Sequence, residues 1–182
     1  MNYCTVSYTA AWWNWERWQQ ELDYMAMNAI NMPLFSVGLD GVWYNTLLRF
    51  NFTEEEARAF LTGPGHSAWQ WMQNIQSYGG PLPKSVIDKH VALGKKILAR
   101  QLELGMQPIQ QGFSGYVPRE LQKKYPQAKI SMKRKWCGFD GTAQLDPTDP
   151  LFHEMGLAFL EEQDKLFGSY GAYAADPFHE SA

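Results

Sequence analysis

The sequence predicts an α/β fold with a parallel sheet, equivalent to roughly the first four strand–helix units of a (β/α)8 TIM barrel. Three observations predict it. Short apolar segments alternate with amphipathic helical segments, which favours parallel strands joined by crossover helices. Four strands and three to four helices in 182 residues are about half of a barrel of roughly 250 residues or more. No linker or repeat divides the chain, so we expect residues 1–182 to form one N-terminal half of a barrel.

The first predicted elements are a strand, a helix and a second strand. Cys4–Tyr8 is predicted as the opening strand. A helix spanning roughly residues 10 to 29 follows from spacings of three and four between apolar residues, namely Ala11, Trp15, Trp18, Leu22, Met25 and Ala29. Most tryptophans of this segment are therefore expected in the core. Met32–Gly38 is a short apolar run typical of a buried strand, with Pro33 near its start, where no ladder hydrogen bond is needed.

The middle of the chain carries two helix signals and one strand signal. Thr53 and Glu56 have the spacing of a capping box, which predicts a helix start. A long helix is predicted from about Ser85 to Leu104, ended by Gly105 in a left-handed conformation. The next strand is predicted within Met106–Gly112.

The last helix is predicted to begin at the Asp149–Pro150 pair, which supplies an N-cap and a first-turn proline, and to end at Gly168. A final strand follows over Tyr170–Ala175. Two long connections, residues 62 to 84 and 113 to 147, are left between these elements. Connections of this length in a compact domain are often functional, and we expect both on the active face of a barrel.

The composition is that of a folded protein, with 45% apolar residues, 19% charged residues and a net charge of -3. The densest basic run, Lys133–Lys135, is too short to follow a phosphate backbone, so we expect no nucleic-acid partner. No apolar run approaches the ~20 residues of a membrane-spanning helix, and no targeting signal is recognised. We therefore expect no membrane partner.

The aromatic content is unusual, because 8 Trp, 9 Tyr and 10 Phe make up 15% of the chain. Indole rings in such density often stack on sugar rings, whose axial hydrogens present an apolar face. A tryptophan-rich core is the other explanation. The four histidines and the two cysteines show no metal-ligand spacing, so we assign no metal site and no cofactor. Neither a phosphate-binding glycine loop nor a nucleophilic serine elbow is present.

Glu180 is the strongest candidate for a catalytic residue. It follows the final predicted strand, and barrel enzymes carry catalytic groups at the carboxyl ends of their strands. A cap or a loop charge is the structural alternative for such a carboxylate. His179 is adjacent to Glu180 and points the opposite way in an extended backbone, so we expect it to line the pocket wall.

Several motifs together resemble the catalytic domain of the α-N-acetylglucosaminidases, glycoside hydrolase family 89. They cover the chain in order: Cys4–Tyr8, Ala11–Trp18, Asp23–Asn31, Phe60–Pro64, Ala68–Trp69, Gly79–Pro83 and Asp176–Glu180. The resemblance implies a retaining exo-hydrolase that removes terminal α-linked N-acetylglucosamine from glycans or glycosaminoglycans, acting in a secreted, periplasmic or lysosomal compartment. It also implies that the remaining half of the barrel is the partner of this chain.

The resemblance further implies roles for individual residues. Glu180 matches the general acid/base. Sugar-pocket positions correspond to Asn2, Cys4, Tyr8, Trp69 and Trp136. No residue matches the nucleophile, and retention requires two carboxyl groups about 5 to 5.5 Å apart, so we expect this chain to be inactive alone.

One position departs from the family pattern, since His179 stands where related enzymes often carry an asparagine that bonds the 2-substituent of the sugar. A ring N–H of His179 could donate the same bond. Two other functions are compatible with the sequence. One is a non-catalytic carbohydrate-binding module with a tryptophan-rich surface, and the other is a helix-rich domain whose tryptophans only pack.

Overall fold

The computed structural model describes residues 3–177 and 179–180. Its α-helices are α1 (Tyr3–Tyr8), α2 (Trp15–Met27), α3 (Leu39–Arg49), α4 (Glu54–Phe60), α5 (Ser67–Trp71), α6 (Lys84–Glu103), α7 (Leu121–Lys124) and α8 (Pro150–Phe167). A 3-10 turn, η1 (Pro64–His66), precedes α5. The strands are β1 (Gln110–Gln111), β2 (Tyr116–Val117), β3 (Ile130–Met132), β4 (Ala143–Leu145) and β5 (Tyr173–Ala174).

Three extended segments lie side by side in parallel. β1 pairs with β5, and a parallel bridge joins Leu34 to Ile109 on the other side of the same segment. The predicted strands within Met32–Gly38, Met106–Gly112 and Tyr170–Ala175 are therefore adjacent in chain order. The α/β class is confirmed by the parallel pairing of these segments and by the helices that lie between them in the chain. The described residues form no closed barrel, and the number of four strand–helix units is not confirmed.

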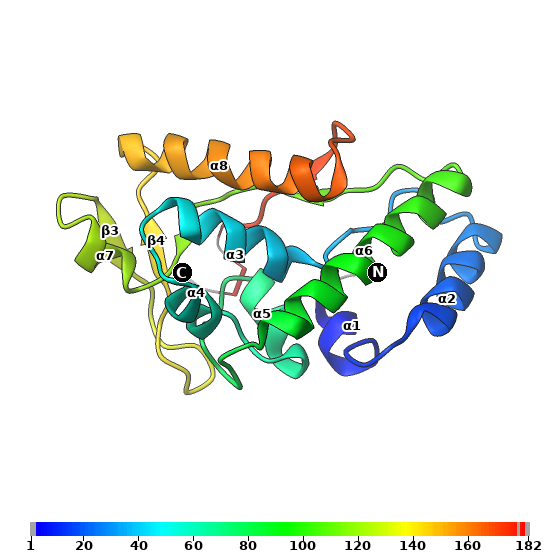
Figure 1. Cartoon of the computed structure of the whole chain (residues 1–182), viewed down its shortest axis with the longest axis horizontal. Helices are drawn as coiled ribbons and strands as arrows, with labels where there is room; N and C mark the ends of the chain where they lie inside the picture. The colour runs from blue at the N-terminus through cyan, green and yellow to red at the C-terminus, as the bar shows by residue number, and fades with distance from the viewer. Residues whose placement is uncertain (1–2, 178, 181–182) are drawn as a thin grey trace.

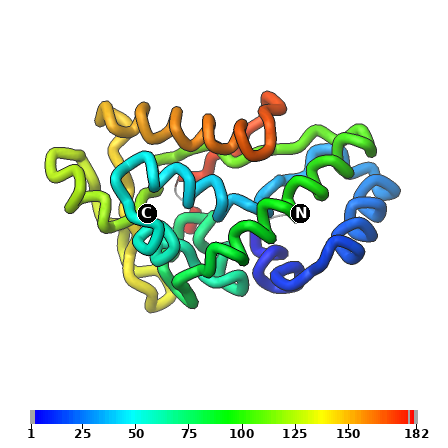
Figure 2. Tube along the Cα trace, in the orientation of Figure 1, coloured from blue at the N-terminus to red at the C-terminus, as the bar shows by residue number. Residues whose placement is uncertain are grey.

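The helices are arranged around these segments (Figure 1). α8 runs along one side of the molecule, and α2 lies at the opposite end of the long axis from the β3–β4 hairpin. The chain after α8 turns back into the middle of the molecule, where β5 meets β1 (Figure 2). The main helix contacts are those of α3 with α8, of α1 with α5, of α2 with α6 and of α3 with α6. No helix in the described part of the chain is both long and apolar enough to cross a membrane.

The predicted opening strand at Cys4–Tyr8 is wrong, because this segment is helix α1. Among the described residues only one edge of the Leu34 segment is paired, on the side of Ile109, and α1 does not extend the sheet. A helix satisfies its backbone hydrogen bonds within the segment, so it needs no neighbouring strand. Contacts with α5 then hold α1 in place, including a hydrogen bond from the Ala68 N–H to Ser7 Oγ at 2.9 Å.

The helix predicted at residues 10 to 29 begins later than expected. Its N-cap is Asn14, whose side chain accepts a hydrogen bond from the Arg17 N–H at 3.1 Å. Such a side-chain bond satisfies an otherwise unpaired amide at a helix start, so helix α2 begins after Asn14 and the residues before Asn14 are not part of it. Trp18 is buried as expected, but Trp12 is 80% exposed.

Helix α3 was not predicted, and its burial explains why. Eight of its residues are buried, including Asp40, Trp43 and Thr46, so apolar and polar positions do not separate onto two faces. A helix buried on most sides lacks the periodic pattern by which amphipathic helices are recognised. Its Trp43 ring contacts the rings of Phe60, Tyr116 and Phe159 at the centre of the core.

The remaining helix signals are confirmed. Thr53 and Glu56 form the capping box of α4. Asp149 caps α8 by accepting a hydrogen bond from the Leu151 N–H at 2.9 Å. α6 ends before Gly105, which has a positive φ of 70°.

The two long connections contain structure of their own. Residues 62 to 84 include η1 and α5, and residues 113 to 147 form the antiparallel sheet β2–β4–β3 together with α7. These are the segments that bring aromatic side chains to the candidate site.

Candidate active site

Glu180 lies in the segment that follows β5, beside an indole ring. Its Oε2 accepts a hydrogen bond from Trp136 Nε1 at 3.1 Å. The side chain of Glu180 is exposed, so the carboxylate is accessible to a ligand from solvent. Because Trp136 and Glu180 are 44 residues apart, the contact joins the β3–β4 hairpin to the chain after β5.

A cavity of about 460 Å³ contains this carboxylate. The side chains around it come from α1, from η1 and the residues around α5, from the β3–β4 hairpin and from the chain after β5. They are Cys4, Tyr8, His66, Trp69, Met72, Ile75, Trp136, Cys137, Phe139 and Glu180. The structure therefore brings together five of the seven predicted site residues.

Local geometry explains why α1 contributes two of these five. Cys4 and Tyr8 are four residues apart, so they lie on the same face of the helix, one turn apart. The Tyr8 ring meets the Trp69 ring of α5 edge to face, with centroids 5.4 Å apart. Cys4 and Cys137 both line the cavity as free cysteines. Cys4 and Tyr8 therefore line the site although their segment is a helix and not the predicted strand.

The aromatic ring of Trp136 is directed by a tight turn. Trp136 and Phe139 exchange two backbone hydrogen bonds, of 3.1 and 2.8 Å, across Cys137 and Gly138. Both central residues have positive φ angles, of 48° and 87°, which is the conformation of a type I′ hairpin turn. The turn leaves the Trp136 and Phe139 rings stacked, with centroids 6.1 Å apart.

The other two predicted residues differ from these five. Asn2 lies outside the described residues. His179 does not line the cavity; its Nδ1 is 2.7 Å from Asp176 Oδ2. The predicted contact between His179 and a sugar stays a prediction.

Two aromatic side chains that line the cavity, His66 and Phe139, were not predicted, and neither was Tyr78, which contacts both. The His66 ring contacts the Tyr78 ring, and Tyr78 contacts Phe139, each with centroids 4.8 Å apart. These contacts connect the two long connections at the edge of the cavity. The sequence signal was the presence of aromatic residues in both long connections, but their meeting depends on tertiary structure.

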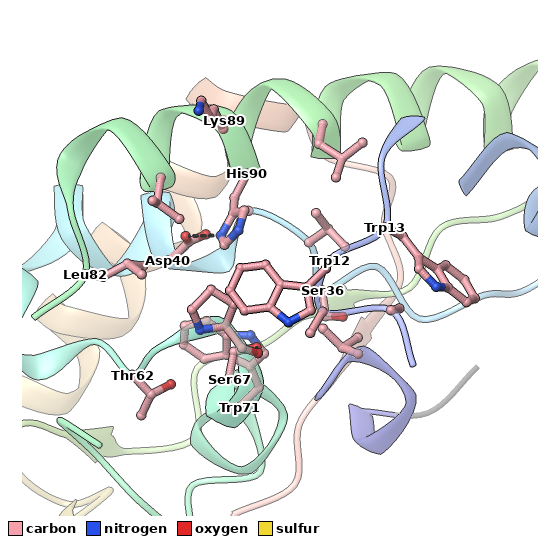
Figure 3. A pocket seen from close by; sticks show the side chains of 18 of the residues that line it. Trp12, Trp13, Ser36, Asp40, Thr62, Ser67, Trp71, Leu82, Lys89 and His90 are labelled. Atoms are coloured by element: carbon pink, nitrogen blue, oxygen red, sulfur yellow. Dashed lines mark hydrogen bonds and ion pairs between the residues drawn. The ribbon is translucent and has the colours of Figure 1, made fainter. Parts of the chain in front are cut away.

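A second cavity, of about 330 Å³, lies on the other side of α1 and α5. Figure 3 shows Asp40 and His90 on one side of it and Ser67 and Trp71 on the other. His90 Nδ1 is 2.6 Å from Asp40 Oδ2. Burial alone would lower the pKa of His90, but the hydrogen bond and the charge of Asp40 outweigh it, so this pKa lies above its usual value.

Among the described residues, no three His, Cys, Asp or Glu side chains are grouped so that they could hold a metal ion. The Glu180 cavity instead combines several aromatic rings with one accessible carboxylate, in a segment after the carboxyl end of a parallel strand. Rings of this kind suit the apolar faces of sugars. An aromatic cavity with an accessible carboxylate beyond the end of a parallel strand is typical of α/β proteins that bind carbohydrate.

Comparisons with known proteins agree with this class. The family described as "Alpha-N-acetylglucosaminidase (NAGLU) tim-barrel domain" matches residues 1–182. The alpha-N-acetylglucosaminidase of Homo sapiens is 37% identical over 183 residues, which cover 98% of this chain and 25% of the human protein. The chain therefore belongs to the α-N-acetylglucosaminidase family, glycoside hydrolase family 89.

Solved structures of a family 89 glycoside hydrolase from Clostridium perfringens are also similar. The complex with 2-acetamido-1,2-dideoxynojirmycin has a TM-score of 0.94 at 36% identity and covers 99% of this chain and 21% of that chain. The complex with PUGNAc has a TM-score of 0.93 at 37% identity, with coverages of 98% and 21%.

A third structure of the Clostridium enzyme carries two Glu-to-Gln substitutions and contains its substrate, GlcNAc-alpha-1,4-galactose. It matches this chain with a TM-score of 0.94 at 36% identity, over 100% of this chain and 21% of that chain. The present chain thus spans about a quarter of the human relative and about a fifth of the Clostridium chains.

Proposed function

We propose that this chain is the N-terminal half of the catalytic barrel of a retaining exo-glycosidase that removes terminal α-linked N-acetylglucosamine from glycans or glycosaminoglycans. Glu180 is the general acid/base. Cys4, Tyr8, Trp69 and Trp136 bind the terminal sugar, as do Asn2 and His179 by the family resemblance. The same resemblance supports a secreted, periplasmic or lysosomal location.

The observation that carries the proposal is the position of Glu180 in an aromatic cavity, with its Oε2 bonded to the Trp136 indole. The rings of Tyr8, Trp69 and Trp136 offer apolar faces to a pyranose, and the accessible carboxyl group lies beside them. A carboxyl group in such a place can donate a proton to a glycosidic oxygen and later accept one from water.

A second carboxyl group is needed for retention, about 5 to 5.5 Å from the first. Glu180 is the one Asp or Glu among the residues described as lining the cavity. The nucleophile is therefore proposed to come from the part of the relatives' length that this chain does not cover. By this reasoning the 182-residue chain alone turns over no glycoside.

The test uses the coding region extended to the length of the relatives, and an aryl α-N-acetylglucosaminide as substrate. The extended protein is expected to hydrolyse it, and NMR of the first product should show the α-anomer. For the methyl α-glycoside, whose poor leaving group needs the proton, Glu180→Gln is expected to lower kcat/KM about 10²- to 10⁴-fold. Glu154→Gln, the same change at an exposed position of α8, is the control and should retain parental activity.

Two results would contradict the proposal. Undiminished turnover by Glu180→Gln would remove Glu180 from the acid/base role. An extended protein that binds N-acetylglucosamine, seen by tryptophan quenching, but hydrolyses no α-N-acetylglucosaminide would instead indicate a carbohydrate-binding module.

A further inference from the structure

The segment that carries Glu180 is attached to the β3–β4 hairpin at two points. Trp136 Nε1 donates to the Glu180 carboxylate at 3.1 Å. Lys133 Nζ donates to the backbone carbonyl of Pro177 at 2.8 Å. Lys133 and Trp136 are three positions apart in the hairpin, and their partners Pro177 and Glu180 are three positions apart in the segment after β5.

Gln73 connects this pair of attachments to the protein core. Its side-chain amide donates to the Asp176 carbonyl at 2.8 Å, and its Oε1 accepts from Lys133 Nζ at 3.4 Å. Its backbone carbonyl accepts from Thr142 Oγ1, on the other side of the hairpin, at 2.7 Å. Gln73 is therefore bonded to both sides of the hairpin and to the segment before Glu180.

The backbone conformation of Gln73 indicates that its surroundings hold this residue firmly in place. Gln73 is 2% exposed and has a φ of 68°, in the left-handed region that favours glycine. A non-glycine residue persists there only where its surroundings hold it. Its side-chain and backbone hydrogen bonds to Asp176 and Thr142 are surroundings of that kind.

The bond from Trp136 has a chemical consequence for Glu180. An indole N–H is a donor only, so the carboxyl oxygen that it contacts must accept. When Glu180 is protonated, its proton therefore belongs on Oε1, while Oε2 stays bonded to Trp136. The orientation of the carboxyl group is then set by the hairpin.

We propose that the β3–β4 hairpin positions the acid/base Glu180, with Lys133 and Trp136 as its positioning residues and Gln73 as their anchor. This inference rests on the proposed function. During bond cleavage, the Oε1–H proton passes to the glycosidic oxygen, and the C–O electron pair leaves with the departing alcohol. The nucleophilic carboxylate, proposed above to lie outside this chain, donates the electron pair of the new bond to the anomeric carbon. The negative charge left on Glu180 is held at Oε2 by the Trp136 N–H.

Substrates with different leaving groups test the role of the hairpin. A poor leaving group, such as an alkyl alcohol, needs the proton, whereas 2,4-dinitrophenolate departs without it. Trp136→Phe keeps an aromatic wall and removes the N–H. A hydrogen bond to a charged group is worth roughly 10- to 100-fold in rate. Trp136→Phe should therefore lower kcat/KM by about that factor for the methyl α-glycoside, and change kcat/KM for the dinitrophenyl α-glycoside less than threefold.

Lys133 provides an independent arm of the same experiment in the extended protein. Lys133→Met is expected to show the same dependence on the leaving group, and Lys133→Arg is expected to recover part of the loss, because its guanidinium can still donate to the Pro177 carbonyl. Lys135→Met is the matched control on the same hairpin. The Lys135 side chain is 73% exposed and pairs with Asp140, so this change should leave both substrates unaffected.

The outcomes separate the possibilities. Equal losses on both substrates for Trp136→Phe and for Lys133→Met, in variants with parental thermal unfolding, would overturn the inference and leave the hairpin as a wall only. Unchanged kinetics in both variants would also overturn it. If the unsubstituted extended protein hydrolyses neither glycoside, the proposed function fails instead.

Discussion

Two cavities lie on opposite sides of helix α1, and each contains a carboxylate in a different environment. Cys4 and Tyr8 of α1 face the Glu180 cavity, whereas Val6 of the same helix and Ala10 after it face the Asp40–His90 cavity. Glu180 is exposed and held by the neutral N–H of an indole. Asp40 is 4% exposed and held by an imidazole whose pKa is raised.

The comparison shows how burial distinguishes a carboxylate that stabilises the fold from one that can react with a ligand. A buried carboxylate needs a charged or hydrogen-bonded partner, and Asp40 has one in His90. The Asp40–His90 pair therefore joins α3 to α6 at the wall of this cavity. Glu180 keeps one oxygen accessible, in a segment that follows the last strand, and this suits proton exchange with a ligand.

The largest expected effect is a loss of stability when a buried side chain in the wall of the Asp40–His90 cavity is removed. Trp18→Ala removes a 5% exposed indole and should lower the free energy of unfolding by about 3 to 5 kcal/mol. Trp12 lines the same cavity at 80% exposure, so Trp12→Ala should change the free energy of unfolding by less than about 0.5 kcal/mol. Chemical denaturation of both variants measures the difference. Equal losses would show that this cavity is not stabilised by its buried wall.

The next effect tests the buried carboxylate. Asp40→Asn should cost about 1 to 3 kcal/mol, because the change weakens a buried hydrogen bond. The folded His90 pKa is raised above 6.5, so the contribution of its charge is fully present below about pH 6.5 and is lost as the pH rises through the folded pKa. Urea denaturation should therefore show a larger difference between parent and variant at pH 5.5 than at pH 8.5.

The corresponding NMR titration sharpens this test. In Asp40→Asn, burial remains but the neighbouring charge is gone, so the pKa of His90 should fall below that of the parent. An unchanged His90 pKa would show that Asp40 does not control the pair.

A smaller effect is expected at the wall of the Glu180 cavity. Trp69→Ala should weaken binding of N-acetylglucosamine in the extended protein by about 1.5 kcal/mol, or roughly tenfold, because it removes a ring on which the sugar is proposed to stack. Titration calorimetry measures the loss. Binding equal to that of the parent would place the sugar away from α5.

The smallest effect provides a comparison remote from both cavities. Thr53→Ala removes the N-cap of α4 and should cost about 1 kcal/mol of stability. Thr53→Ser keeps the hydroxyl and should cost less. Thermal unfolding measures both variants, and KM for the aryl substrate should not change in either. A change in KM would mean that global stability, rather than local contacts, controls the Glu180 cavity.

The parts of this protein that sequence reasoning predicted correctly are those with short-range causes. The α4 capping box, the Asp149–Pro150 start of α8 and the Gly105 end of α6 each depend on residues within one turn of a helix. The family resemblance indicated Cys4, Tyr8, Trp69, Trp136 and Glu180 as site residues; these five line one cavity, and their roles stay predictions.

Long-range packing decided the rest. α3 escaped prediction because burial on most of its faces removes the periodic signal, and residues 3 to 8 became a helix rather than a strand. The Asp40–His90 pair spans 50 residues and the Trp136–Glu180 bond spans 44. The sequence by itself determined the starts of α4 and α8, the end of α6, the α/β class and the side chains available for chemistry. Only the tertiary structure decided which side chains meet, because contacts between distant residues depend on the packing of the whole chain.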